Sequence, residues 1–228
     1  MATTFQRAYV WELPVRIYHW VTFCGIVALV ATGLLIGAPL AFMSSGDASS
    51  QTWFGTVRMI HFIAGMLITF ALVLRIYWMF AGNRHARWDN FFPITPRLVA
   101  RQVQSAYKVL KADILQVEVQ PYDFEGHNGL ASASYAGIFL LTVFQIVTGF
   151  GLYAAMSDWW FPQLFAWVVP LMGGDAHVRL WHHLATWAFV IFTMIHVYLA
   201  TFHDYTEAHG EISSMVSGSR FLPPRMHR

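Results

Sequence analysis

The sequence predicts an all-α integral membrane protein built as a four-transmembrane-helix bundle. Of its 228 residues, 57% are hydrophobic and only 11% are charged, whereas about 25% are charged in a typical soluble domain. Four segments of about 20 mostly apolar residues are each long enough to cross a hydrocarbon core of about 30 Å. We expect a single domain over residues 1–228, with spans at about 17–38, 57–81, 130–155 and 180–202.

The first apolar segment is expected to be a permanent span rather than a cleaved signal peptide. It runs into "GAPLAFMSS" without an A-x-A cleavage site.

The basic residues predict the orientation of the spans. The loops at 39–56 and 156–178 contain no Lys or Arg, whereas 11 of the 14 basic residues lie in the head, the central loop and the tail: Arg7, Arg16, Arg84, Arg87, Arg97, Arg101, Lys108, Lys111, Arg220, Arg225 and Arg228. By the positive-inside rule, both termini and the central loop are cytoplasmic.

The central loop contains the stretch "PRLVARQVQSAYKVLKADIL". Its apolar residues recur at spacings of three to five, at Leu98, Val103, Tyr107, Leu110 and Ile114. This spacing predicts an interfacial helix between the second and third spans, with its cations toward anionic membrane lipid.

No nucleic-acid partner is needed to explain the net charge of +2. A single cysteine, Cys24, excludes a disulfide framework within the chain and a Cys-rich metal site.

Five of the eleven histidines lie inside predicted spans, where ionisable residues usually mark function, and four of these five are the candidate ligands: His19, His61, His182 and His196. The predicted directions of the helices place His61 and His182 toward the outer side and His19 and His196 toward the cytoplasmic side. His182 and His196 are 14 residues apart, which is a rise of about 21 Å and a return to within about 40° of one helix face. His183 is turned about 140° from His196.

Two imidazoles that face each other across a bundle can supply both axial ligands of a haem iron. The pairs His61/His182 and His19/His196 therefore predict two b haems, stacked at an outer and an inner level. Interhelical hydrogen bonding or a proton relay is the alternative use of intramembrane histidines. Copper or zinc would require a further cluster of ligands, which neither level provides.

Small residues and one cation recur with the same 14-residue step. Gly33 follows His19 by 14 residues, Gly137 and Gly151 are 14 apart, and Arg75 follows His61 by 14. We expect these glycines, together with Gly65, to make room for the haems, and Arg75 to pair with a haem propionate. Helix packing by the glycines and snorkelling by Arg75 are the alternatives.

In order along nearly the whole chain, the motifs "YVWELPVRIYHW", "VRMIHFIAGM", "LRIYWMFAGN", "GHNGLA", "TGFGLY", "WHHLATW" and "IHVY" resemble the b-type cytochrome subunit of membrane-bound nickel-iron hydrogenases. The resemblance implies a subunit of the bacterial inner membrane that does not activate hydrogen itself. Such a subunit anchors the small and large hydrogenase subunits on the periplasmic side and passes electrons from the iron-sulfur small subunit through both haems to quinone. It also implies His61/His182 as outer-haem ligands and His19/His196 as inner-haem ligands.

Several alternatives stay open at this point. His183 stands where the family has arginine, so that ligation by His183 in place of His182 is possible. The motif "GHNGL" places His127 and Asn128 where they would hydrogen-bond a quinone or cap the third helix. The related cytochrome b subunit of formate dehydrogenase, or of another periplasm-facing oxidoreductase, is the nearest alternative function. A haem-free anchor or proton-conducting bundle is the alternative of a different class.

Overall fold

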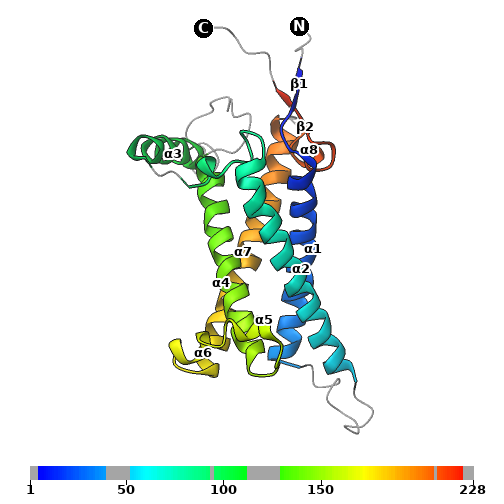
Figure 1. The fold of residues 1–228 in the computed structure, drawn as a ribbon. Helices are drawn as coiled ribbons and strands as arrows, with labels where there is room; N and C mark the ends of the chain where they lie inside the picture. Colours follow the sequence, from blue (N-terminus) through cyan, green and yellow to red (C-terminus); the bar gives the residue numbers. More distant parts are fainter. Residues whose placement is uncertain (1–4, 40–51, 93–94, 112–128, 208–209, 223–228) are drawn as a thin grey trace. The chain divides into compact units, whose positions relative to one another are not determined.

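The structure is a computed structural model that describes all residues except 1–4, 40–51, 93–94, 112–128, 208–209 and 223–228 (Figure 1). Four long helices dominate it: α1 (Leu13–Gly37), α2 (Trp53–Ala81), α4 (Gly129–Ala154) and α7 (Asp175–Glu207). Each is long and apolar enough to cross a membrane. The predicted all-α fold with four transmembrane helices is confirmed.

Helix α7 extends further at both ends than the apolar pattern predicted. It begins at Asp175 rather than near residue 180, and its first turn contains that acidic residue. A carboxylate is favourable near the positive end of the helix dipole. Asp175 also pairs with Arg179 four residues later, with 2.5 Å between Oδ2 and Nε, and such pairs support a helix end in polar surroundings.

Large apolar side chains on the long helices are exposed. Phe70 and Phe80 of α2 are 71% and 72% exposed, and Met194 of α7 is 69% exposed. Apolar surface on this scale is unfavourable in water. The same side chains suit contact with the hydrocarbon of a bilayer.

The chain divides into two compact units, and each long helix contributes a part to both. We call Met1–His19, Leu74–Leu140 and Ile195–Arg228 the terminal unit, and Trp20–Val73 and Leu141–Met194 the internal unit.

The terminal unit contains a two-stranded antiparallel sheet that the sequence did not predict. Strand β1 (Gln6–Tyr9) pairs with β2 (Ser219–Leu222), with Gln6 opposite Leu222 and Tyr9 opposite Ser219. A short helix, α8 (Glu211–Ser217), precedes β2 and ends at Gly218, whose φ of 82° favours glycine. The carbonyl of Gly218 accepts bonds from the backbone N–H groups of Val10 and Trp11. These contacts hold the segment before α1 against the segment after α7.

Helix α2 ends in a turn organised by Asn83 and Glu12. Glu12 Oε2 accepts bonds of 2.8 Å from both the indole N–H of Trp78 and the backbone N–H of Asn83. The side chain of Asn83 donates to the carbonyl of Val10 and accepts from the backbone N–H of Ala86. The start of α1 is thereby fixed to the end of α2.

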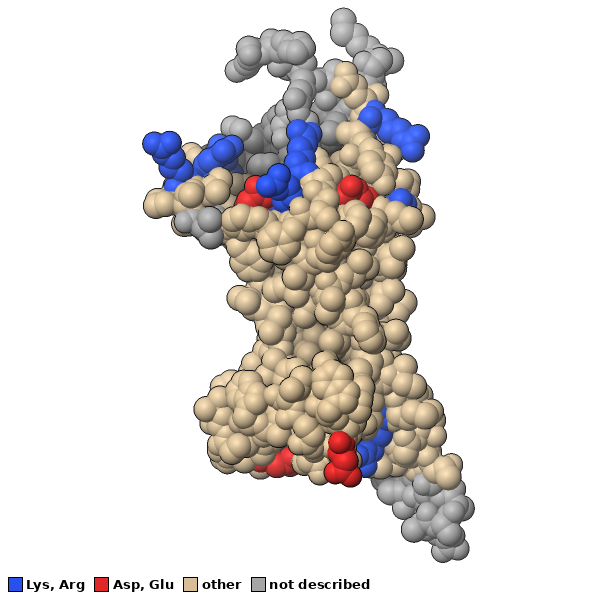
Figure 2. Space-filling model, in the orientation of Figure 1, with Lys and Arg blue, Asp and Glu red and all other residues tan. Residues whose placement is uncertain are grey.

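The central loop contains a short 3-10 helix, η3 (Trp88–Asn90), and the helix α3 (Pro96–Val109). Thr95 caps α3 by accepting a bond from the backbone N–H of Leu98. The side chains of Val99, Val103 and Tyr107 are exposed along α3, as an interfacial helix requires. Ile114, expected on the same face, lies outside the described residues. Figure 2, in the orientation of Figure 1, shows Lys and Arg side chains gathered over the part of the terminal unit that contains α3, α8 and β2.

In the internal unit, two short helices follow α4: α5 (Trp160–Gln163) and α6 (Val168–Leu171). The ring of Phe150 in α4 stacks on Phe165, with 5.4 Å between centroids, and meets Phe161 edge-on at 5.0 Å. Val168 is 2% exposed. The aromatic segment after α4 therefore packs against the end of that helix.

Candidate functional site

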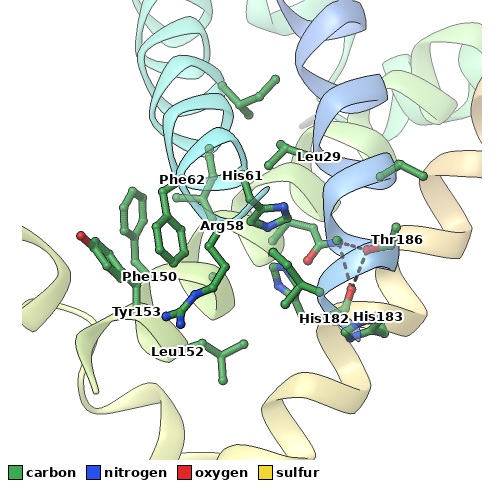
Figure 3. A pocket seen from close by; sticks show the side chains of 18 of the residues that line it. Leu29, Arg58, His61, Phe62, Phe150, Leu152, Tyr153, His182, His183 and Thr186 are labelled. Carbon is green, nitrogen blue, oxygen red and sulfur yellow. Dashed lines mark hydrogen bonds between the residues drawn. The ribbon is translucent and has the colours of Figure 1, made fainter. Parts of the chain in front are cut away.

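The internal unit contains a cavity of about 380 Å³ that is lined by all four long helices (Figure 3). Small-molecule and cofactor sites are typically cavities of about 300–1,000 Å³ with mostly apolar walls and a few polar groups. His61 of α2 and His182 of α7 both line this cavity. Two of the predicted ligands are thus brought together.

The ring of each of these histidines is held by a threonine of a neighbouring helix. Thr32 Oγ1 of α1 lies 2.8 Å from His61 Nδ1, and Thr148 Oγ1 of α4 lies 2.8 Å from His182 Nδ1. Each hydroxyl also donates its hydrogen within its own helix, Thr32 to the carbonyl of Ala28 at 2.6 Å and Thr148 to that of Phe144 at 2.8 Å.

These bonds assign the protonation of both rings. A threonine hydroxyl has one hydrogen to donate, and here that hydrogen is used in the helix. The hydroxyl oxygen must therefore accept a bond from Nδ1–H of the imidazole. In a neutral imidazole with a proton on Nδ1, the lone pair is on Nε2. Nε2 of His61 and Nε2 of His182 are therefore the atoms able to bind a metal.

Glycines make room beside both rings. A Cβ added at Gly33 would lie 3.4 Å from Cε1 of His61, and one added at Gly149 would lie 3.3 Å from Cε1 of His182. Gly65 also lines the cavity, and a Cβ there would meet no described atom within 4 Å. Gly151, which we expect to face a haem, packs against Val168, which an added Cβ would approach to 2.8 Å. Gly149 is among the residues that line the cavity.

Two arginines line the cavity as well, and the sequence pattern pointed to neither of them as part of a site. Arg58 donates to the sulfur of Met156 at 2.7 Å, and its guanidinium lies 5.9 Å from the ring centre of Phe62. Arg179 forms its ion pair with Asp175. Guanidinium groups recognise carboxylates well. The cavity therefore offers both metal-binding nitrogens and carboxylate-binding cations.

His183 also lines the cavity, but its ring is held by its own helix. Nδ1 of His183 lies 3.0 Å from the carbonyl of Arg179, one turn earlier in α7. Since a carbonyl can only accept, Nδ1–H donates this bond. The hydrogen bond of His182 Nδ1 is made to a neighbouring helix, whereas the ring of His183 bonds its own helix and lies against Gly37 of α1.

A buried polar atom in the cavity wall can accept a hydrogen bond from a donor inside the cavity. Gln145 donates through Nε2 to the carbonyl of His182 and to the hydroxyl of Thr186, both at 3.0 Å. Its Oε1 is buried without a hydrogen-bond partner among the described residues. Buried polar atoms are rarely left unpaired in proteins.

The terminal unit contains the second predicted pair. The ring centroids of His19 in α1 and His196 in α7 lie 6.4 Å apart. The hydroxyl of Tyr135 in α4 lies 3.5 Å from His196 Nδ1. Two imidazoles from different helices thereby come close enough to hold one iron-containing cofactor between them.

Arg75 lies in the terminal unit and is 7% exposed. It donates through Nη1 to the carbonyl of Ala86 at 2.9 Å, and its guanidinium lies 4.9 Å from the ring centre of Phe91. Gly137 lies in the same unit, and a Cβ there would meet no described atom within 4 Å. His127 and Asn128 lie outside the described residues.

The paired imidazoles suit a metal whose other ligands come from a cofactor. Among the described residues, no group of three or more His, Cys, Asp or Glu side chains could hold a free metal ion. Two imidazoles complete the coordination of an iron already held by the four nitrogens of a porphyrin. The residues present therefore fit haem.

Four apolar helices of transmembrane length and histidines paired between helices define a multi-pass membrane protein of the cytochrome b class. The chain belongs to the prokaryotic cytochrome b561 family, which it matches over residues 10–218.

Similar proteins cover nearly the whole chain. A probable Ni/Fe-hydrogenase B-type cytochrome subunit of Azotobacter vinelandii is 40% identical over 217 residues, which are 94% of this chain and 88% of the relative. The protein of the same description from Cupriavidus necator is 38% identical over 221 residues, 94% of this chain and 87% of the relative. The probable Ni/Fe-hydrogenase 1 B-type cytochrome subunit of Escherichia coli K12 is 37% identical over 216 residues, 93% of this chain and 90% of the relative.

Proposed function

We propose that this chain is the di-haem cytochrome b subunit of a membrane-bound nickel-iron hydrogenase. It anchors the small and large hydrogenase subunits, accepts electrons from the iron-sulfur small subunit, and delivers them through two b haems to membrane quinone. The observation that carries the proposal is the presence of one histidine pair in each unit, with matched interhelical anchors on the pair His61/His182. The descriptions of the relatives support the hydrogenase as partner.

Four imidazoles would hold the haems: His61 and His182 the outer one, and His19 and His196 the inner one. Haem b, when bound, supplies an iron that takes up and releases one electron at a time. The protein's part is to fix the imidazoles and keep water away from them. Apolar walls and nitrogens fixed by hydrogen bonds do both in the internal unit. Gly33, Gly65 and Gly149 leave space beside the outer pair, and Gly137 is proposed to do so near the inner pair.

Haem propionates need cations or hydrogen-bond donors inside the membrane. We assign Arg58 and Arg179 to the outer haem because both line the cavity around His61 and His182. We assign Arg75 to the inner haem because it is buried in the same unit as His19 and His196. One of its five N–H donors is used by Ala86, which leaves others for a carboxylate.

The proposed orientation has both termini and the central loop in the cytoplasm, with the chain forming one transmembrane domain over residues 1–228 in the bacterial inner membrane. The basic side chains gathered in the terminal unit support it (Figure 2). The pair His61/His182 would then face the periplasmic hydrogenase, and the pair His19/His196 would face the quinone-reducing side. His127 and Asn128, which precede α4, are proposed to hydrogen-bond the quinone.

Purification of the full chain with its natural partners in a mild detergent tests this function. We expect hydrogenase subunits to copurify, a reduced b-type α band with about two haems per chain, and reduction of the haems by hydrogen followed by reoxidation with added quinone. A colourless protein would reject the haem assignment and favour an anchor or proton-conducting bundle. Copurified formate dehydrogenase subunits would assign the chain to that enzyme instead.

A further inference from the structure

Two Thr-Gly dipeptides on different helices make the same set of contacts in the internal unit. Thr32-Gly33 of α1 meets His61, and Thr148-Gly149 of α4 meets His182. In each dipeptide the threonine bonds Nδ1 of the ring, and the glycine faces Cε1 of the same ring. A Cβ on the glycine would lie 3.4 Å from Cε1 in the first case and 3.3 Å in the second. The two histidines are thus held alike by helices α1 and α4.

The correspondence extends to the threonine hydroxyls. Thr32 Oγ1 lies within 2.6 Å of the carbonyl four residues earlier and 3.4 Å of the one three residues earlier. For Thr148 these distances are 2.8 and 3.3 Å. A hydroxyl that already donates is polarised and accepts a further bond more strongly. Both threonines are therefore oriented as acceptors before any cofactor is bound.

We propose that Thr32 and Thr148 are positioning residues that set the reduction potential of the haem held by His61 and His182. The inference rests on the proposed function, because it takes these histidines as haem ligands. Each threonine fixes its histidine as the tautomer with a proton on Nδ1 and leaves Nε2 for the iron. The bond from Nδ1–H also adds electron density to the imidazole, which makes Nε2 a stronger donor.

A stronger imidazole donor favours the ferric form of the iron and so lowers the reduction potential. With a threonine on each ligand, the outer haem receives this effect from both sides. In the terminal unit, the hydroxyl of Tyr135 lies 3.5 Å from His196 Nδ1.

Valine and serine substitutions of both threonines test the proposal in the purified holo-complex. Thr32→Val and Thr148→Val keep the shape of the side chain but remove the acceptor, whereas Thr32→Ser and Thr148→Ser keep the hydroxyl. Thr69→Val is the matched control, because Thr69 makes the same bond to the carbonyl four residues earlier, at 2.8 Å to Gly65. It lies in the internal unit as well.

Each valine variant is expected to keep both haems, to shift the midpoint potential of one haem upward, and to change the electron paramagnetic resonance g-values of that haem. The double variant should shift the same haem further, while the serine variants and Thr69→Val should match the wild type. Unchanged potentials in both valine variants, an equal shift in Thr69→Val, or shifts of two different haems would overturn the proposal.

Two further measurements separate the possible failures. If His61→Ala loses one haem while the valine variants leave the potentials unchanged, the threonine inference fails and the proposed function stands. If His61→Ala keeps both haems, the ligand assignment itself fails.

If a valine variant does not accumulate, nuclear magnetic resonance of the reduced, ¹⁵N-histidine-labelled wild type decides. Slowly exchanging, downfield Nδ1–H protons on both outer ligands support the proposal, and rapidly exchanging protons at the shift of a solvent-exposed imidazole overturn it.

Discussion

His19 and His196 lie with their ring centroids 6.4 Å apart and their planes at 59°. One residue comes from near the start of α1 and the other from the second half of α7. The two residues are 177 positions apart in the sequence. The arrangement of the two helices brings them together and places the two imidazoles where they could share a metal.

Replacement of His19 or His196 by alanine should remove one haem and leave the other. The remaining pair, His61 and His182, lies in the other unit and keeps its threonine anchors. Haem content measured as the pyridine haemochromogen should fall from about two to about one per chain. His177→Ala is the control, because His177 is exposed and bonds only locally, to the carbonyl of Gly173 at 3.0 Å. Retention of both haems in either variant would reject that ligand.

His182→Ala should remove the outer haem, whereas His183→Ala should leave both haems in place. His182 is anchored by Thr148 of another helix, while His183 bonds to its own helix. Haem content and a potentiometric titration of the α band distinguish the two variants. The reverse outcome would move the ligand to His183.

Gly149→Val should destabilise the internal unit and weaken haem binding. Even a single Cβ at Gly149 would lie 3.3 Å from Cε1 of His182, and the valine methyl groups extend further. Overpacking of a filled site costs about 1–3 kcal/mol. The measurements are the thermal midpoint in detergent and the haem content.

Gly55→Ala serves as the control for this change, since a Cβ at Gly55 meets no described atom within 4 Å. A Gly149→Val protein with wild-type stability and haem content would contradict the packing seen around His182.

Ser214→Ala should destabilise the terminal unit. Ser214 is 1% exposed, accepts a bond of 3.1 Å from the indole N–H of Trp11, and donates to the carbonyl of Glu211. The substitution removes this buried hydrogen bond, and a typical hydrogen bond contributes about 0.5–1.5 kcal/mol to stability. Ser213→Ala, at an exposed position of the same helix, should change the thermal midpoint much less. Equal effects of the two changes would show that the bond to Trp11 is unimportant.

The spans could be predicted because an apolar run of about 20 residues has few other uses. It is harder to predict which neighbouring element each residue of a span packs against. The 14-residue step predicts that Gly151 faces a haem, but it does not predict that the same glycine packs against Val168 of α6. The position of the aromatic segment after α4 depends on contacts such as Phe150 with Phe165, which no periodicity encodes.

The threonine anchors were missed for a related reason. Thr32 and Thr148 read as ordinary helical residues, and only the rotation of α1 against α2 and of α4 against α7 within the internal unit brings their hydroxyls to the imidazoles. A signal was present, since the dipeptide Thr-Gly occurs at 32–33 and again at 148–149. The strands β1 and β2 had no comparable signal, because each has four residues and they pair across more than 200 positions.

The pairing of β1 with β2 has a practical consequence for handling the protein. A truncation before Ser219 would remove the partner of Gln6–Tyr9 and expose an unpaired strand edge at the opposite end of the chain. A truncation before Gly218 would also remove the carbonyl that accepts bonds from the backbone N–H groups of Val10 and Trp11. A change in either strand therefore affects the other, although the two strands lie more than 200 positions apart in the sequence.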